Sequence, residues 1–411
     1  MTDTGSTREA GAPERRTPRP TPADATRQVS DRDIVGLTRE VARGGISRRQ
    51  FLVRAAALGL TTSAIGTVLA ACGTGDEPTA AETKIEKVVP EEIIFYNWTD
   101  YLAPISKKNF KKETGITLKE TYFDDNEALY AKLSAGATGY DVICPSDYMV
   151  HVLIMADLVT PLDMSLIPRF KNVDPKFQKP SFDPETDGHK YSVPYQWGDT
   201  GIGVRTDKVA ETVTSWQTMW DPKHKGEIIM DSEMRETIGA ALKLLGYSLN
   251  STSEDELTQA GDKLIEQKPL VAAYDANNMK RNMIRGTPLV HAWNADALLV
   301  MDQIGQDKLD YVLPTEGFCV WVDCLAIPKG ANSPYGAHLW MDFICDVKNQ
   351  AELTDWVWYL SPVPAAYDLI ETQLLIDNFP TQEELDRGEL MDDVGEFTRV
   401  YSETWRRVKS A

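Results

Sequence analysis

The chain has 411 residues, of which 43 are basic and 62 acidic, so its net charge at neutral pH is −19. A protein this acidic repels nucleic acid and anionic lipid, and neither is expected as a partner. The five histidines are scattered, and no C-x-x-C or H-x-x-x-H spacing occurs. The sequence therefore predicts no metal site and no other cofactor.

Residues 1–71 have the pattern of an export signal, not of a globular domain. Arg48 and Arg49 precede a modestly apolar stretch, which is typical of the twin-arginine export route, and the following L-A-A-C ends in Cys72, the residue that a lipoprotein signal presents for lipidation. The apolar run is short and diluted by Ala, Gly and Thr, so a permanent transmembrane helix is the poorer interpretation. We expect residues 72–90 to be a flexible tether behind a lipid anchor.

Removal of the signal would make the protein more acidic. The 71 residues before Cys72 carry 11 basic and 7 acidic side chains, which leaves a net charge of −23. Such a charge attracts cations, although solubility outside the cell is an equally good reason for it. Roughly 320 residues follow the tether, enough for two domains or one large domain.

Four cysteines remain in the mature chain, and their pairing is left open. Cys319 and Cys324 lie five residues apart in a strand-like run, so they point to opposite faces and should not bond each other. The four residues are Cys144, Cys319, Cys324 and Cys345.

Short apolar runs of strand type alternate with helical patterns along the mature chain. This alternation indicates α/β domains with mostly parallel sheets, in which ligands bind beyond the carboxyl ends of the strands. Helices are predicted at 105–114, 126–135 and 235–247. Strands are predicted at 93–98, 116–123, 140–145, 200–206, 227–231, 271–275, 288–293 and 319–328.

Aromatic and carboxylate side chains recur together where these strands end. An aromatic face attracts an alkyl ammonium and covers its methylenes, while a carboxylate pairs with the desolvated charge, so the pattern predicts a site for an organic cation. Trp321 and Asp323 are two apart in a strand and share a face. The strand-end residues are Trp98, Thr99, Asp100, Tyr101, Ser146, Asp147, Tyr148, Asp231, Glu233, Glu236, Trp293, Asn294, Asp296, Trp321 and Asp323.

Each of these residues also has a structural interpretation. A single Trp or Tyr at a strand end more often fills a core than contacts a ligand, and Glu233 and Glu236 near a helix start could complement the helix dipole. The glycines at 200–204 lack the rest of a phosphate loop. No G-x-S-x-G or H-E-x-x-H motif occurs, so an enzyme is the weaker hypothesis.

The order of several motifs resembles the spermidine/putrescine-binding proteins of ABC importers, a group of periplasmic solute-binding proteins. The motifs are FYNWTDYL at 95–102, YAKLSAGATGYDVICPSDY at 130–148, YSVPYQWGDTGIGV at 191–204, WNAD at 293–296 and LPTEGFCVWVDCLAIP at 313–328. The resemblance implies an α/β, type II periplasmic-binding-protein-like fold, with two lobes of mixed, mostly parallel sheets that close about crossing strands. We place lobe 1 at 91–200 with 294–340 and lobe 2 at 201–293 with 341–411, and the crossings near 200–204, 291–293 and 337–341.

The resemblance also implies a ligand pocket and roles for its residues. Asp100, Asp323 and one or both of Glu233 and Glu236 would pair with ammonium groups. The rings of Trp293, Trp321, Tyr101 and Tyr148 would enclose the methylene chain, and Thr99 and Ser146 would make lesser hydrogen bonds. The implied pocket comprises Trp98, Thr99, Asp100, Tyr101, Ser146, Tyr148, Glu233, Glu236, Trp293, Trp321, Asp323 and Tyr359.

Three positions depart from the familiar pattern of the family. Met391 stands where spermidine binders carry a polar side chain, Glu233 replaces an aspartate, and Asp100 is the acid of putrescine-preferring relatives. Spermidine and putrescine both remain candidate ligands, with spermidine slightly ahead.

The sequence therefore predicts a monomeric, lipid-anchored, non-enzymatic binding protein on the outer face of the cytoplasmic membrane. It would capture a polyamine and deliver it to the permease subunits of an ABC importer. One alternative keeps the fold and binds another organic cation, such as a basic amino acid, an opine or a quaternary amine. A surface-anchored enzyme on the same frame is the less favoured alternative.

Overall fold

The computed structural model describes residues 85–185 and 188–411. The predicted export signal, the lipidation residue Cys72 and the tether up to residue 84 lie outside the described residues. Residues 85–91 contain no helix or strand, and the first strand begins at Glu92. Among the described residues, no helix has both the length and the apolar character to cross a membrane.

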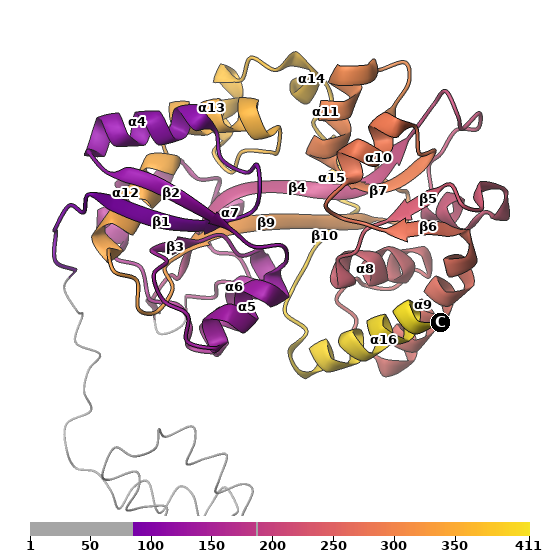
Figure 1. Ribbon diagram of the computed structural model, residues 1–411, viewed down its shortest axis with the longest axis horizontal. Coiled ribbons are helices and arrows are strands. Elements are labelled where there is room, and N and C mark those ends of the chain that lie inside the picture. The colour runs from indigo at the N-terminus through magenta and orange to yellow at the C-terminus, as the bar shows by residue number, and fades with distance from the viewer. Residues whose placement is uncertain (1–84, 186–187) are drawn as a thin grey trace, which may run out of the picture. The chain divides into compact units, whose positions relative to one another are not determined.

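The described chain folds into two α/β lobes around one continuous mixed sheet (Figure 1). In the first lobe, β1 pairs in parallel with β2 and β3, and α12 and α13 return late in the chain to pack on β1 and α4. The first-lobe strands are β1 (Glu92–Asn97), β2 (Thr117–Tyr122) and β3 (Val142–Ile143). The first-lobe helices are α4 (Pro104–Thr114), α5 (Asn126–Ser134), α6 (Asp147–Met155), α7 (Pro175–Gln178), α12 (Pro334–Ile344) and α13 (Val347–Val357).

The second lobe repeats this arrangement. β5 pairs in parallel with β6 and β7, α10 and α11 pack together near β7, and α8, α9 and α16 pack on one another. Its strands are β5 (Ile228–Met230), β6 (Val271–Tyr274), β7 (Leu289–Trp293), β8 (Asp310–Val312) and β10 (Gly388–Leu390). Its helices are α8 (Met234–Leu244), α9 (Glu254–Gln267), α10 (Met279–Arg285), α11 (Asn294–Ile304), α14 (Gln373–Asp377), α15 (Gln382–Leu385) and α16 (Thr398–Ser410).

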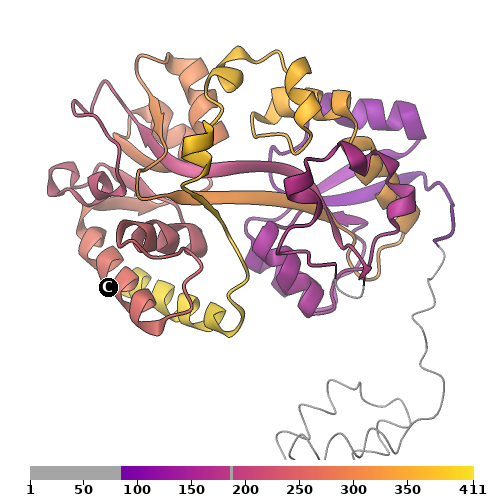
Figure 2. The ribbon, with the colours of Figure 1, turned by 180° about the vertical axis from the view of Figure 1, so that it is seen from behind.

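Two long antiparallel strands, β4 (Ser192–Val204) and β9 (Phe318–Ala326), run through both lobes (Figures 1 and 2). β9 meets β3 in the first lobe, and β4 meets β7 and β8 in the second. The sheet order is therefore β2-β1-β3-β9-β4-β7-β5-β6. Every residue of β4 and β9 is buried, because elements of both lobes cover the two faces of the pair.

Two of the three predicted crossings lie elsewhere, whereas the one near residues 200–204 falls on β4, which runs through both lobes. Residues 291–293 lie in β7, inside the second lobe, and residues 337–341 lie in α12, inside the first. The third passage between the lobes falls at about residues 370–372. It follows the 3-10 helix Pro364–Leu369, which packs on α13, and precedes α14, which contacts α11. Consequently α11 belongs to the second lobe and α12 and α13 to the first, which reverses the predicted assignment of 294–304 and 341–357.

An aromatic cluster forms the core of the first lobe. The indole of Trp340 in α12 lies with its ring centroid 6.0 Å from Phe95, 5.1 Å from Phe110 and 5.5 Å from Phe343. All four side chains are buried. These contacts attach α12 and α4 to β1 and so hold the strand end that enters the site.

The four cysteines of the described chain are free and buried. Cys319 and Cys324 do not bond each other, as their spacing along the strand predicted. Burial raises the pKa of the Cys345 thiol, as desolvation disfavours the thiolate.

At Gly201, strand β4 packs closely against β8 of the second lobe. A Cβ atom at this position would collide with the carbonyl oxygen of Val312 in β8. We expect Gly201→Ala to destabilise the protein by about 1–3 kcal/mol, measured by urea unfolding. Gly239→Ala in α8 is the control, because its Cβ would meet Leu249 at an ordinary 3.5 Å and alanine favours a helix. Equal unfolding midpoints for the two variants would contradict this account.

Candidate ligand-binding site

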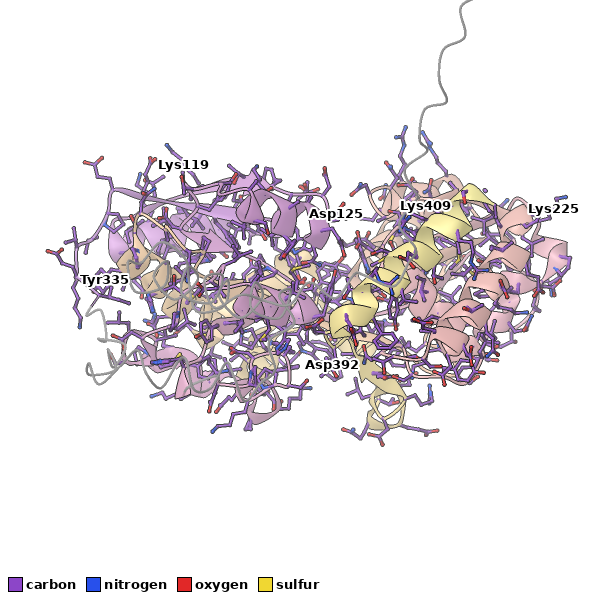
Figure 3. All side chains as sticks on the ribbon, turned by 90° about the horizontal axis from the view of Figure 1, so that it is seen from below. Lys119, Asp125, Lys225, Tyr335, Asp392 and Lys409 are labelled. Atoms are coloured by element: carbon purple, nitrogen blue, oxygen red, sulfur yellow. The ribbon has the colours of Figure 1, made fainter. Side chains whose placement is uncertain are left out.

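A cavity of about 640 Å³ lies between the two lobes, and all twelve residues predicted for the pocket line it. They come from the end of β1, the start of α6, the start of α8, the end of β7, strand β9 and the segment after α13. Seen from below, Asp125 of the first lobe and Asp392 of the second lie on facing sides of the two lobes (Figure 3). Nearby, the two lobes approach each other, and His151 Nε2 of the first lobe is 3.8 Å from Asp393 Oδ2 of the second.

Asp323 on β9 is a buried carboxylate held by hydroxyl donors. Its Oδ2 accepts a hydrogen bond from Tyr101 at 2.8 Å and its Oδ1 accepts one from Ser146 at 2.7 Å. Asn126 in turn donates to the Ser146 hydroxyl at 3.0 Å. Burial raises the pKa of Asp323 to about 6, although both hydroxyls oppose the shift. The carboxylate therefore has a fixed direction but lacks a cationic partner among the contacts described for it.

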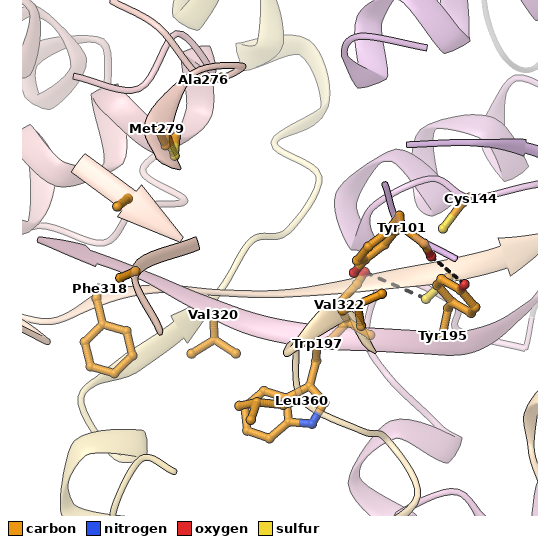
Figure 4. Close-up of a cluster of buried hydrophobic side chains, with 14 of the residues drawn as sticks. Tyr101, Cys144, Tyr195, Trp197, Ala276, Met279, Phe318, Val320, Val322 and Leu360 are labelled. Carbon is orange, nitrogen blue, oxygen red and sulfur yellow. Dashed lines mark hydrogen bonds between the residues drawn. The ribbon is translucent and has the colours of Figure 1, made fainter. Parts of the chain in front are cut away.

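Aromatic rings stand next to this carboxylate. The ring centroid of Tyr359 lies 5.1 Å from Trp321 and 5.4 Å from Tyr101, both nearly perpendicular. Tyr195 packs against Tyr101 and donates a hydrogen bond to its carbonyl oxygen at 2.7 Å (Figure 4). Trp98 is held on the same side by a hydrogen bond from its indole to the carbonyl of Cys144 at 2.9 Å. Buried groups thus hold the rings of Tyr101 and Trp98 in place.

A second acidic group lies at the start of α8. Glu236 is buried; one carboxylate oxygen accepts a hydrogen bond from Thr200 at 3.1 Å, and Oε2 has no hydrogen-bond partner. Burial raises the pKa of Glu236 to about 8, with a further contribution from Glu233. Burial and the neighbouring Asp231 also raise the pKa of Glu233 well above its usual value. These acids are more than helix-dipole partners, because they are desolvated side by side.

Two of the predicted residues lie at a more open part of the cavity wall. Thr99 and Asp100 are exposed, although both line the cavity. Asp100 has a left-handed backbone with φ of 59°, a conformation that Asp tolerates better than most residues. This turn ends β1 and redirects the chain before Tyr101 enters the core.

The cavity also contains residues that the predicted pocket omitted. Asp296, at a strand end in the sequence, lines the wall and is paired with Lys280 at 2.9 Å. Arg235 stacks on Tyr148, with its guanidinium carbon 5.5 Å from the ring centroid. Met391 is buried in the wall. The W-N-A-D motif pointed to Asp296, whereas no pattern in the sequence signalled Lys280 or Asn126.

The described residues contain no group of three or more His, Cys, Asp or Glu side chains placed to hold a metal ion. The acids of the cavity are instead spread over both lobes, between aromatic rings. Two α/β lobes that enclose such a cavity about crossing strands define a solute-binding protein.

Comparisons with known proteins identify the family. Residues 106–379 match the family model described as bacterial extracellular solute-binding protein, and the chain belongs to this family. It is 35% identical over 323 residues to the spermidine/putrescine-binding periplasmic protein of Escherichia coli (strain K12), which covers 77% of this chain and 91% of the relative. It is 34% identical over 325 residues to the protein of the same name from Salmonella typhimurium, covering 78% of this chain and 92% of that one.

A solved structure agrees with this result. The putative spermidine/putrescine ABC transporter from Listeria monocytogenes matches with a TM-score of 0.73 and 33% identity, over 78% of this chain and 99% of that one. The two-lobe fold expected from the sequence is thereby confirmed. These relatives are named for binding or transport and not for catalysis.

The raised pKa values predict how stability depends on pH without ligand. The folded-state pKa of Glu236 is about 8, against about 4.3 when unfolded. Between these two pH values the folded protein binds more protons than the unfolded protein. The contribution of Glu236 to the free energy of unfolding is therefore largest below about pH 4.3, and it is lost as the pH rises toward 8. We expect the melting temperature of the ligand-free protein to fall between pH 5 and 8, and to fall less in Glu236→Gln.

The control is Glu254→Gln, which removes an exposed acid at the start of α9. Thermal melts at constant ionic strength measure all three proteins. A Glu236→Gln curve that falls as steeply as the other two would show that Glu236 does not titrate in this range.

Proposed function

We propose that this protein binds a polyamine, spermidine or putrescine, outside the cytoplasm and delivers it to the permease of an ABC importer. The observation that carries the proposal is a pair of desolvated carboxylate groups, Asp323 in β9 and Glu236 in α8, in one cavity walled by aromatic rings. The names of the relatives agree with this chemistry.

A polyamine would relieve the electrostatic cost of this cavity. Desolvation disfavours the charged form of Asp323 and Glu236, and a ligand ammonium restores it by pairing and hydrogen bonding. The rings of Trp321, Tyr359 and Tyr101 offer faces to the methylenes between two ammonium groups. A quaternary amine would leave the carboxylate oxygens without donors, so it fits less well.

An amino acid or an opine would also bring a carboxylate that needs a cation. Among the described lining residues, the cations are Arg235 and Lys280. Arg235 donates to the carbonyl of Asp392 at 3.1 Å and to Asn250 at 2.9 Å, and Lys280 pairs with Asp296. Since both cations are engaged, the wall favours a ligand with positive charge only.

We further propose that the twin-arginine pair Arg48 and Arg49 exports the folded protein and that Cys72 carries the lipid that holds it, as a monomer, on the outer face of the cytoplasmic membrane. The family's extracellular character agrees with export, and the sequence motifs support the route and the anchor.

Isothermal titration with spermidine, putrescine, spermine and a quaternary amine tests the proposed function directly. We expect one-to-one binding of a polyamine and none of the quaternary amine. Asp323→Asn should weaken polyamine binding by about 2–5 kcal/mol, because it removes a desolvated charge partner. Asp255→Asn, at an exposed acid outside the cavity, is the matched control. Unchanged affinity in Asp323→Asn would remove Asp323 from the site, and silence for every polyamine would refute the function.

Export and anchoring are tested in cells. We expect Arg48→Lys with Arg49→Lys to leave unprocessed protein in the cytoplasm, because the twin-arginine route reads both guanidinium groups. Cys72→Ser should abolish incorporation of labelled palmitate. Fractionation and lipid labelling provide the measurements, and Arg54→Lys, also a conservative change in the signal, is the control. Normal lipidation of the double variant would exclude the proposed route.

A further inference from the structure

Lys280 differs from the other cation of the cavity wall. Arg235 is almost fully buried, and its guanidinium is held by Asn250, the Asp392 carbonyl and the ring of Tyr401, 4.7 Å away. Lys280, on α10, has a side chain that is 45% exposed, and its ammonium pairs with Asp296 on α11. Lys280 is therefore the mobile partner of a buried acid, since a lysine stem has four rotatable methylenes.

Asp296 stands close to the acids that would receive the ligand. Its side chain is only 8% exposed. Asp100 and Asp231 are both close enough to interact electrostatically with Asp296. Burial raises the pKa of Tyr359, and the charges of Asp296 and Asp323 raise it further. The cavity thus holds Asp296 and Asp323 around Tyr359, with Asp100 near Asp296, and Lys280 neutralises Asp296.

The chemistry of the Lys280 side chain matches the proposed ligand. An ammonium on a four-carbon stem is equivalent to one end of putrescine. While the Lys280 ammonium is paired with Asp296, this acid is already neutralised. A ligand ammonium placed there would also be repelled by the positive charge of Lys280. A diamine needs a single ammonium partner at this end, whereas a third ammonium requires a further acid.

We propose that Lys280 is a specificity-determining residue: by holding Asp296 with an internal ammonium, it limits the number of ligand ammonium groups that this end of the cavity accepts. The inference rests on the proposed polyamine function and deepens it. Lys280 thus weakens spermidine binding relative to putrescine binding, whichever of the two ligands the wild-type protein binds more tightly.

The test is the ratio of dissociation constants for spermidine and putrescine, measured by titration of the full chain at pH 8. We expect Lys280→Met to tighten spermidine binding about tenfold, the effect of one partly buried charge pair, and to change putrescine binding by less than about threefold. Adding Asp296→Asn to Lys280→Met should return the ratio to its wild-type value, because the freed acid is then absent.

Arg281→Met is the charge-matched control. Arg281 follows Lys280 on the same helix, is exposed and does not line the cavity, so its removal changes the net charge equally. Circular dichroism and thermal melts establish that each variant folds, and Lys280→Gln takes the place of Lys280→Met if the latter does not.

The outcomes separate the inference from the function on which it rests. If Lys280→Met tightened the binding of both ligands equally, or if Arg281→Met gave the same change, Lys280 would act only by repelling any cation. Either result would overturn the inference. An unchanged ratio would do the same, and in each case the protein would remain a polyamine binder. Absence of polyamine binding in the wild type would refute both.

Discussion

The antiparallel pairing of β4 with β9 is the constraint on which the rest of the structure depends. The register runs from Ser192 opposite Ala326 in the first lobe to Thr200 opposite Cys319 in the second. This pairing carries Trp321 and Asp323 to the boundary between the lobes, and it places Thr200 beside Glu236. A one-residue slip would turn both cavity residues of β9 to the opposite face of the sheet.

Desolvation gives the cavity its chemistry. The strands and rings that define its shape also remove water from Asp323 and Glu236, which makes their charges costly in the absence of a cation. A cationic ligand would offset that cost, as the internal cation Lys280 does for the buried Asp296. The same burial thus underlies the expected pH dependence without ligand, the proposed preference for ammonium groups and the proposed competition at Asp296.

Rigid support accompanies the charges. Asn126 orients Ser146, Ser146 and Tyr101 orient Asp323, and Tyr195 fixes the backbone of Tyr101. Because these contacts lie within the first lobe or on a crossing strand, half of the site is organised independently of the second lobe. The acids of α8 complete the site from the other side.

The sequence by itself determined most of the strands, because periodicity and local composition report which segments form strands and where they end. The strand ends and the family resemblance together located twelve of the residues that line the cavity. The sequence did not reveal that β4 begins at Ser192, since Pro194, Gln196 and Gly198 interrupt the apolar pattern that marks a strand. Only the tertiary structure decided which lobe α11, α12 and α13 join, because an amphipathic helix does not specify the sheet on which it packs. Tertiary structure also decided the pairing of Lys280 with Asp296, since contacts between residues on different helices depend on packing and leave no local pattern.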